Sequence, residues 1–306
     1  MTISGFLKYV EIKTKITSVF SFAMITGYLF SIGQPVDVQK TAVFFAGMFL
    51  FDLATTSINN YIDTKSNGLP LPVSRKSAAV ITAFLLVASA GLGIGLVLMT
   101  DTIVLLIGAL CFATGVLYTY GPLPISRQPW GELVSGLFYG LVIPFLILYI
   151  NMPQGYYMAV SLNAETLSVE LQILPILTVL LLAVSPVCCT ANIMLANNIC
   201  DLEKDVRVKR HTLPYYIGVP NALKLFAFIY YITYANTVLL VITRILHPVA
   251  LLALITIVPV QKNINIFMST QDKEETFPVS IANFIAIMSA LVLVIWMGGF
   301  LTRLAV

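Results

Sequence analysis

Residues 196–218 read ANNICDLEKDVRVKRHTLPYYIG, and seven of the ten positions from 201 to 210 are charged. The chain as a whole is very different. Of its 306 residues, 58% are hydrophobic and 10% are charged, and its mean hydropathy is +0.93. A soluble domain carries about 25% charged residues. The composition therefore predicts an integral membrane protein, and the crowding of its few charges into one segment predicts a site there.

Apolar segments long enough to cross a bilayer recur along the whole chain. A window of about 20 residues finds nine of them. They cover residues 16–33, 40–60, 78–99, 102–120, 131–150, 173–199, 221–243, 247–260 and 281–301. The predicted fold class is all-α, with nine transmembrane helices in a single domain that spans residues 1–306. The segment 151–172, which connects two spans, is expected to be a surface loop outside the membrane. The charged segment 270–279 is expected to be a solvated inside loop, and a role in closing the cavity remains the alternative.

The distribution of basic residues predicts how the chain sits in the cell membrane. With the N-terminus inside, three of the 17 Lys and Arg residues fall outside, namely Lys40, Arg244 and Arg303, and 14 fall on the cytoplasmic side. An excess of Lys and Arg in cytoplasmic loops is the usual bias of such proteins. We therefore expect a multi-pass protein of the cell membrane, surrounded by the lipid bilayer, with a cytoplasmic N-terminus. The small net charge of +3, without a basic tract rich in aromatic residues, argues against a nucleic-acid partner.

The charged segment has a counterpart earlier in the chain. Residues 58–68 read INNYIDTKSNG and residues 196–206 read ANNICDLEKDV, so both follow the pattern Asn-Asn-x-x-Asp-x-x-x-(Asn or Asp). The two copies are 138 positions apart and end the second and sixth predicted spans on the same, cytoplasmic side. This predicts a parallel internal repeat, with halves at approximately 16–150 and 173–301.

The spacing within each copy predicts a stripe of oxygen ligands. Positions i, i+4 and i+8 share one face of a helix, and a residue at i+3 joins them. Carboxylate and amide oxygens suit Mg²⁺, which is commonly held by one or two carboxylates together with substrate phosphates. The predicted metal ligands are Asn59, Asp63, Asn67, Asn197, Asn198, Asp201 and Asp205. Basic side chains nearby would complement the phosphates: Lys65, Arg75, Lys76, Lys204, Lys209 and Arg210.

Two other interpretations of the same charges remain open. Charged residues between spans are often only the solvated, positive part of a cytoplasmic loop. A transporter also uses internal repeats and polar residues in its spans, but its binding site lies near the middle of the bilayer on interrupted helices. Both motifs of this chain lie instead at the ends of spans, where a site for a charged ligand from the cytoplasm is favoured.

At these two motifs, and at residues 118–140 (YTYGPLPISRQPWGELVSGLFYG), the chain resembles the UbiA superfamily of membrane prenyltransferases. It looks most like the branch that prenylates 1,4-dihydroxy-2-naphthoate in menaquinone synthesis. The resemblance implies nine helices around a central cavity, with Asp-rich motifs on the second and sixth helices that hold Mg²⁺ and a polyprenyl diphosphate. It also implies the reaction: transfer of a long isoprenyl group to dihydroxynaphthoate with decarboxylation, giving demethylmenaquinol. Another aromatic acceptor, such as 4-hydroxybenzoate, remains open because apolar residues shape the acceptor pocket.

The same resemblance assigns roles to individual residues. It implies that Asp63, Asp201 and Asp205 are essential for catalysis and that the Asn residues of both motifs lie at the metal. The further substrate-binding candidates that it adds are Lys13, Asn60, Tyr118 and Arg127. One departure concerns the first motif, where relatives commonly have Asp at the positions of Asn60 and Asn67. Asp63 is then the only carboxylate of that motif, and the number of bound metals remains open.

Overall fold

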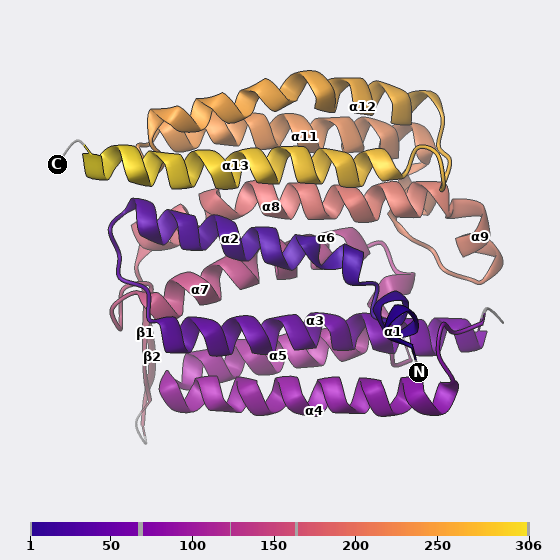
Figure 1. Cartoon of the computed structure of the whole chain (residues 1–306), viewed down its shortest axis with the longest axis horizontal. Coiled ribbons are helices and arrows are strands. Elements are labelled where there is room, and N and C mark those ends of the chain that lie inside the picture. The colour runs from indigo at the N-terminus through magenta and orange to yellow at the C-terminus, as the bar shows by residue number, and fades with distance from the viewer. Residues whose placement is uncertain (1, 67–69, 123, 163–164, 305–306) are drawn as a thin grey trace.

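The apolar segments form long helices that run nearly parallel to one another (Figure 1). A helix satisfies its backbone N–H and C=O groups internally, which lipid cannot do for them. The computed structural model describes residues 2–66, 70–122, 124–162 and 165–304. Eight helical segments within these residues are long and apolar enough to cross a membrane. They are α3 (Val38–Ser66), α4 (Arg75–Met99), α5 (Thr102–Thr119), α6–η3–α7 (Gly131–Leu137, Phe138–Val142, Ile143–Asn151), α8 (Ile173–Cys200), α11 (Val219–Ile242), η4–α12 (Pro248–Thr256, Ile257–Ser269) and α13 (Pro278–Leu304).

The first expected span is shorter than the others. It is helix α2 (Ile16–Ser31), whose 16 residues rise about 24 Å, less than the roughly 30 Å of a hydrocarbon core. A single turn of 3₁₀ helix, η1 (Ile12–Lys15), leads directly into it. Nine full-length spans are therefore not confirmed: the described residues contain eight, together with this shorter helix.

The eighth expected span, 247–260, is too short in the prediction. The observed segment continues from Pro248 to Ser269 through four polar residues, Gln261, Lys262, Asn263 and Asn265. Asn263 Nδ2 donates a hydrogen bond to Asn283 Oδ1 of α13 at 2.8 Å. Because Asn263 has a hydrogen-bond partner on the neighbouring helix, it can remain within the span. The helix therefore continues beyond the end of the apolar run that the prediction used.

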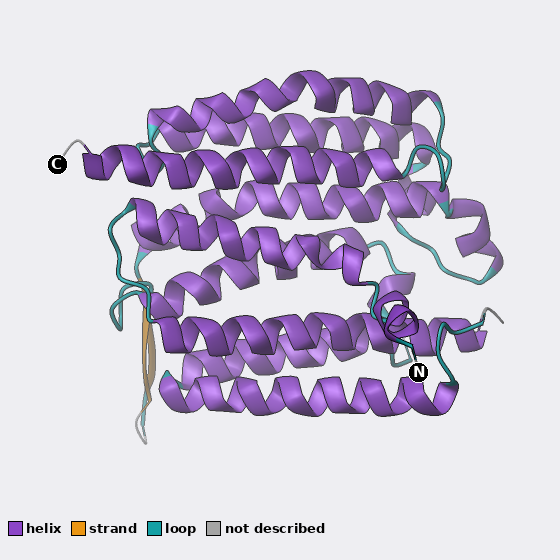
Figure 2. Ribbon diagram, in the orientation of Figure 1, coloured by secondary structure: helices purple, strands orange, loops and turns teal. Residues whose placement is uncertain are grey.

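Residues between α7 and α8, expected to be a plain loop, instead form an antiparallel hairpin. Strand β1 (Met158–Leu162) pairs with β2 (Leu167–Leu171), and Met158 lies opposite Leu171 (orange in Figure 2). The hydroxyls of Ser161 and Ser168 are 2.5 Å apart across the two strands. This hairpin is a small departure from the predicted all-α class, and it lies at the end of the bundle that carries the C-terminus (Figure 1).

The long helices form two groups. Helices α3, α4 and α5 pack together on one side, and α8, α11, α12 and α13 on the other, with α2 and α6–η3–α7 between them (Figure 1). The C-terminal ends of α3 and α8 lie at the same end of the bundle, as do α9 and the turn between α12 and α13. Both sequence motifs are therefore at one end of the molecule. The remaining short helices are α1 (Ile3–Tyr9), η2 (Ile125–Arg127), α9 (Leu202–Arg207) and α10 (Leu213–Ile217).

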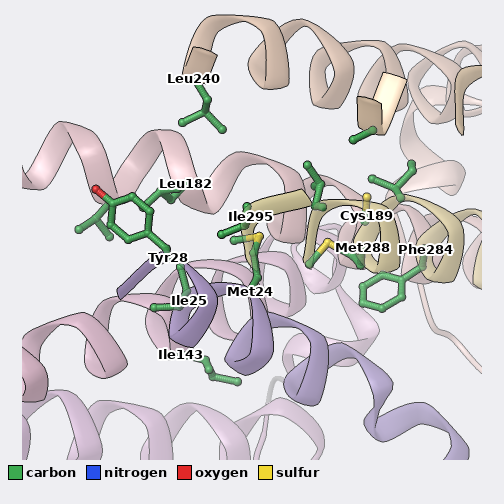
Figure 3. Packing of buried hydrophobic residues seen from close by; sticks show 14 of the residues in the cluster. Met24, Ile25, Tyr28, Ile143, Leu182, Cys189, Leu240, Phe284, Met288 and Ile295 are labelled. Atoms are coloured by element: carbon green, nitrogen blue, oxygen red, sulfur yellow. The ribbon is translucent and has the colours of Figure 1, made fainter. Parts of the chain in front are cut away.

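The largest apolar cluster joins α2, α8, α11 and α13, with Ile25, Leu182 and Met288 among its buried members (Figure 3). The π-turn η3 approaches α8 even more closely. A Cβ atom on Gly140 would lie 2.2 Å from the backbone nitrogen of Val187, next to Pro186. Only glycine allows this contact, which holds Tyr139 of η3 against the interior of the bundle.

Candidate active site

A cavity of about 1170 Å³ lies between the two helix groups. Its wall on α3 extends from Val43 to Asn59, which corresponds to about 24 Å along the helix. Apolar residues such as Phe44, Leu96 and Leu146 form the part far from the motifs. Charged and amide side chains line the part near them: Lys13, Asn59, Asn197, Arg210 and Lys273. The cavity therefore has one polar end, and most of the residues that line the rest of it are apolar.

Helix α3 carries the first motif at this polar end. Asn59 lines the cavity, and its Oδ1 accepts a hydrogen bond from Thr119 Oγ1 at 3.1 Å. Asp63, one turn further on, is half-buried, and the charges of Arg210 and Arg127 act on its carboxylate. Asn60 points elsewhere: its Nδ2 donates to Tyr9 O at 2.9 Å and to Glu11 Oε1 at 3.0 Å. One residue along a helix turns a side chain by about 100°, so Asn60 secures the N-terminal segment and does not line the cavity.

The second motif is not one continuous helix, and the stripe expected from Asn197 through Asp205 needs correction. Helix α8 ends at Cys200, α9 begins at Leu202, and Asp201 between them has φ −93° and ψ 3°. The backbone bonds from Asp201 N–H to Asn197 O and from Asp205 N–H to Asp201 O keep the four-residue spacing. Cys200 is the last apolar residue of the span, and beyond it water can satisfy the backbone, so α9 is free to turn away (Figure 1).

Asp205 is drawn into the protein by this turn. Its side chain is 9% exposed, and its Oδ2 lies 3.7 Å from Arg210 Nε. Burial raises the pKa of the Asp205 carboxyl above its usual value, while the charge of Arg210 opposes that rise. Asp201 and Asp63 act in the same sense as burial. The three predicted catalytic carboxylates therefore influence one another across α3, α8 and α9.

A lysine that the sequence did not single out lies on the second motif. Lys273, from the turn between α12 and α13, donates hydrogen bonds to Asn197 Oδ1 and to Asp201 Oδ2, the latter at 2.5 Å. Of the two interpretations of the segment 270–279, this contact favours a loop at the cavity over a plain solvated loop. Its position could not be found from the sequence, because Lys273 and Asp201 are 72 positions apart.

Asn198 faces away from the cavity. It is buried, and its Nδ2 donates to Glu132 Oε1 of α6 at 2.8 Å. Glu132 is only 5% exposed, and neither its buried Oε2 nor the buried Asn198 Oδ1 has a hydrogen-bond partner in the described part of the chain. Glu132 is a carboxylate at the start of an apolar span, and such a residue indicates function or pairing from the sequence alone.

Arg210 connects the parts of the polar end. Its Nε donates to Ser126 O at 2.8 Å, and the neighbouring His211 N–H donates to Arg127 O at 3.0 Å. The side chain of Arg127 is exposed. Tyr118, also predicted, lines the cavity and its Oη lies 3.2 Å from Ser135 Oγ. The loop after α9 and the loop after α5 thus close over the same site.

The other predicted basic residues lie further out. Lys204 is 79% exposed, with its Nζ 3.8 Å from Asp201 Oδ1, and Lys209 is exposed in a left-handed backbone conformation. Arg75 donates to Tyr61 O at 3.3 Å and lies over the Tyr61 ring, while Lys76 is exposed beside it. None of these four residues is among the described residues that form the cavity wall. Asn67 and the side chain of Lys65 lie outside the described part of the chain.

A second polar cluster, also unanticipated, lies deeper in the cavity wall. Asp52 of α3 accepts hydrogen bonds from Lys15 Nζ, Ser18 Oγ and Tyr139 Oη, each at 2.7 Å. Lys15 Nζ also donates to Thr56 Oγ1 at 2.5 Å. The side chains of Lys15 and Asp52 are each 4% exposed. A charged residue inside an apolar span is a strong signal of function or pairing. Asp52 is such a residue, and its position could be recognised from the sequence.

The oxygen atoms of the second motif fit a hard cation. The Lys273 ammonium already lies between Asn197 Oδ1 and Asp201 Oδ2, and the buried Asp205 Oδ2 has no hydrogen-bond partner among the residues that the structure describes. Among the described residues, however, no group of three or more His, Cys, Asp and Glu side chains is arranged to hold a metal. An ion at this place would therefore need amide oxygens and oxygens of a bound substrate as well, as Mg²⁺ commonly does.

The UbiA prenyltransferase family model matches residues 20–287 of this chain. The chain belongs to the UbiA prenyltransferase family. The family predicted from the two motifs is thus confirmed, and with it a multi-pass protein of the membrane. The fold of this UbiA family member is also similar to the structure of a UbiA homolog from Archaeoglobus fulgidus bound to GPP and Mg²⁺. The TM-score is 0.64 and the identity 12%, over 96% of this chain and 99% of that one.

Two curated relatives share a name. A 1,4-dihydroxy-2-naphthoate octaprenyltransferase of Bacillus subtilis (strain 168) is 33% identical over 143 residues, which are 47% of this UbiA family member and 40% of the relative. Its namesake from Mycobacterium leprae (strain TN) is 26% identical over 185 residues, or 60% and 55% of the two chains. This chain therefore spans about half the length of the curated relatives that it matches.

Proposed function

We propose that this protein transfers a long isoprenyl group from a polyprenyl diphosphate to 1,4-dihydroxy-2-naphthoate, with decarboxylation, to give demethylmenaquinol. The acceptor is inferred from the names of the two curated relatives. The observation that carries the proposal is the cavity, whose wall on α3 is about 24 Å long and leads from Asn59 at the polar end to the apolar residues Val43 and Phe44 at the other. Such a shape suits a substrate with an ionic head and a long hydrocarbon tail.

Different residues of the chain bind the diphosphate and the isoprenoid tail of this substrate. Lys13 and Arg210 line the polar end and supply positive charge for the diphosphate. The apolar wall removes the isoprenoid tail from water, which favours binding in proportion to the buried area. Asn197, Asp201 and Asp205, with Asp63 opposite, would hold Mg²⁺, which when bound supplies electrophilic stabilisation of the diphosphate.

The reaction breaks the bond between the allylic carbon and the diphosphate oxygen, and the electron pair leaves with the diphosphate. A ring carbon of the naphthoate forms the new carbon–carbon bond, and the carboxyl group departs from that carbon as CO₂, which restores the aromatic ring. Arg210 faces the developing charge of the leaving group, and Tyr118 with Ser135 lines the neighbouring wall. The surrounding helices exclude water, which would otherwise capture the electron-poor allylic carbon.

Orientation and internal symmetry are part of the proposal. The excess of Lys and Arg in the loops at the motif end supports a cytoplasmic N-terminus and cytoplasmic active-site loops. Both motifs lie at that end of the bundle (Figure 1), which supports two parallel halves at approximately 16–150 and 173–301 within a single domain.

The test is an assay of the purified full-length protein with Mg²⁺ and a long-chain prenyl diphosphate, with dihydroxynaphthoate and 4-hydroxybenzoate offered in parallel. We expect a prenylated naphthoquinol, and its loss when the metal is chelated. Asp201→Ala should lower the rate at least about 10³-fold, as expected when a metal-binding carboxylate is lost. Glu203→Ala is the matched control, because Glu203 is a neighbouring acid with a 92% exposed side chain.

Each contrary result removes a different part of the proposal. If the protein prenylates 4-hydroxybenzoate and forms no prenylated naphthoquinol, the proposed acceptor is wrong, but the proposed prenyl transfer stands. A fully active Asp201→Ala protein would overturn the assignment of the site.

A further inference from the structure

Lys273 makes the closest charged contacts at the polar end of the cavity. Its ammonium group bridges Asn197 Oδ1 and Asp201 Oδ2, which are two of the predicted metal ligands. The side chain is 36% exposed, compared with 19% for Asp201. The Asp201 carboxylate is therefore largely shielded from water, whereas the Lys273 side chain is more exposed to it.

The turn that carries Lys273 is held in place by its own hydrogen bonds. Asp272 Oδ1 accepts from the backbone N–H groups of Glu274 and Glu275 at 2.7 and 2.8 Å. The backbone N–H of Asp272 donates to Thr276 Oγ1 at 2.8 Å, and Phe277 N–H donates back to Asp272 O at 2.8 Å. The two bonds that the carboxylate accepts, from Glu275 N–H and from Glu274 N–H, lower the pKa of the exposed Asp272 carboxyl. The backbone at Lys273 is thus fixed, and motion of the ammonium is left to the flexible lysine side chain.

In the position in which it contacts Asn197 and Asp201, the ammonium group also lies over an aromatic ring at the cavity wall. Lys273 Nζ is 4.7 Å from the centre of the Phe277 ring, and Lys273, Phe277 and Arg210 all line the cavity. If another cation took the oxygens of Asn197 and Asp201, the ammonium could rotate into the cavity beside Arg210. There it would meet the head group of an anionic substrate.

We propose that Lys273 is a tethered counter-ion that occupies the Asn197–Asp201 oxygen pair before substrate binds and yields this pair to the divalent metal. This inference rests on the proposed function, because it takes the second motif as the metal site. Two positive charges cannot share these oxygens, so Lys273 weakens metal binding in the absence of diphosphate. Metal and diphosphate arriving together remove the conflict, since the diphosphate offers the displaced ammonium new oxygen partners.

The test measures Mn²⁺ binding to the purified full-length protein in detergent without diphosphate, from the electron paramagnetic resonance signal of free Mn²⁺. We expect Lys273→Met to bind Mn²⁺ about tenfold more tightly than the unmodified protein, the size of effect expected from one charge-assisted contact. Lys273→Arg keeps the positive charge at this position and should therefore not show this tighter Mn²⁺ binding. Asp201→Asn should lose the tight binding in every background.

Lys204→Met is the matched control for general electrostatics. Lys204 Nζ lies 3.8 Å from the same carboxylate of Asp201, but its side chain is 79% exposed, compared with 36% for Lys273. Removing it should change Mn²⁺ affinity much less than removing Lys273. Equal tightening in the two variants, or no tightening in Lys273→Met, would overturn the proposal.

The outcomes also separate this inference from the proposed function. Binding of Mn²⁺ that depends on Asp201 but is the same with and without Lys273 would overturn the role of Lys273 alone. Binding that persists in Asp201→Asn would overturn the metal site itself, and the role of Lys273 with it.

Discussion

At the scale of single residues, the ion pair of Lys15 and Asp52 is costly to place where it lies. Both side chains are buried in the wall of a membrane cavity. Bringing two charges out of water is offset only when nearly every polar atom has a partner. Asp52 has three side-chain donors, and Lys15 donates to two side chains and to the backbone O of Asp52 at 3.0 Å. The cluster therefore ties α2 and η3 to α3 through fully engaged charges.

Removing one partner of this pair should reveal its cost. Asp52→Asn leaves the Lys15 ammonium buried without a counter-charge, and we expect the free energy of unfolding to fall by about 3 kcal/mol. Chemical unfolding in detergent micelles, followed by tryptophan fluorescence, would measure this. Asp37→Asn makes the same change in a surface pair with Lys40, whose two atoms are 3.1 Å apart, and should change stability little. Similar losses in both variants would contradict the role assigned to Asp52.

At the scale of elements, the contact between η3 and α8 sets where the cavity wall lies. Gly140 has no side chain, and Pro186 and Val187 approach it at backbone distance. The π-turn adds one residue to the helix at this point, which is a common feature of functional regions in helices. It also carries Tyr139, whose hydroxyl donates to Asp52. A local irregularity of one helix thus delivers a polar group to the interior.

A methyl group at position 140 would have no space. Gly140→Ala should push η3 away from α8 and lower the free energy of unfolding by about 1–3 kcal/mol, because the obstructing atoms belong to the backbone. The same substitution at Gly91 of α4 is the matched control, because a Cβ there meets no atom of the described residues within 4 Å. Thermal unfolding of the two variants in one detergent gives the comparison, and equal melting temperatures would refute the close contact.

At the scale of the whole molecule, the positions of both motifs at one end of the bundle set how it should face the two sides of the membrane. In a variant in which the four cysteines are replaced, Glu203→Cys marks the motif end and Glu170→Cys marks the hairpin end; both positions are exposed. On intact cells, a membrane-impermeant maleimide should label Glu170→Cys and leave Glu203→Cys unlabelled until the membrane is opened. The reverse pattern would overturn the cytoplasmic placement of the site.

Much of this architecture could be predicted because its determinants are local. Continuous apolar runs specify membrane helices wherever they occur, and the four-residue spacing of Asn197 and Asp201 follows from the helix repeat alone. The same spacing predicted Asn59 and Asp63 on one face of α3. The backbone conformation at the ends of those apolar runs was harder to predict, because the chain is free to turn once water can satisfy its backbone N–H and C=O groups. The break at Asp201 and the extension of α12 to Ser269 both belong to this class.

Only the tertiary structure decided which side chains meet. The pairs Lys273–Asp201, Lys15–Asp52 and Asn198–Glu132 join residues that are 72, 37 and 66 positions apart. Asn60 shows the converse, since a motif residue is turned away from the cavity by its bonds to the N-terminal segment. Hydropathy and helical spacing determined by themselves that the chain crosses the membrane repeatedly and places two oxygen-rich motifs at helix ends. Which cation lies against which oxygen depends on how whole helices pack, and no local pattern records that packing.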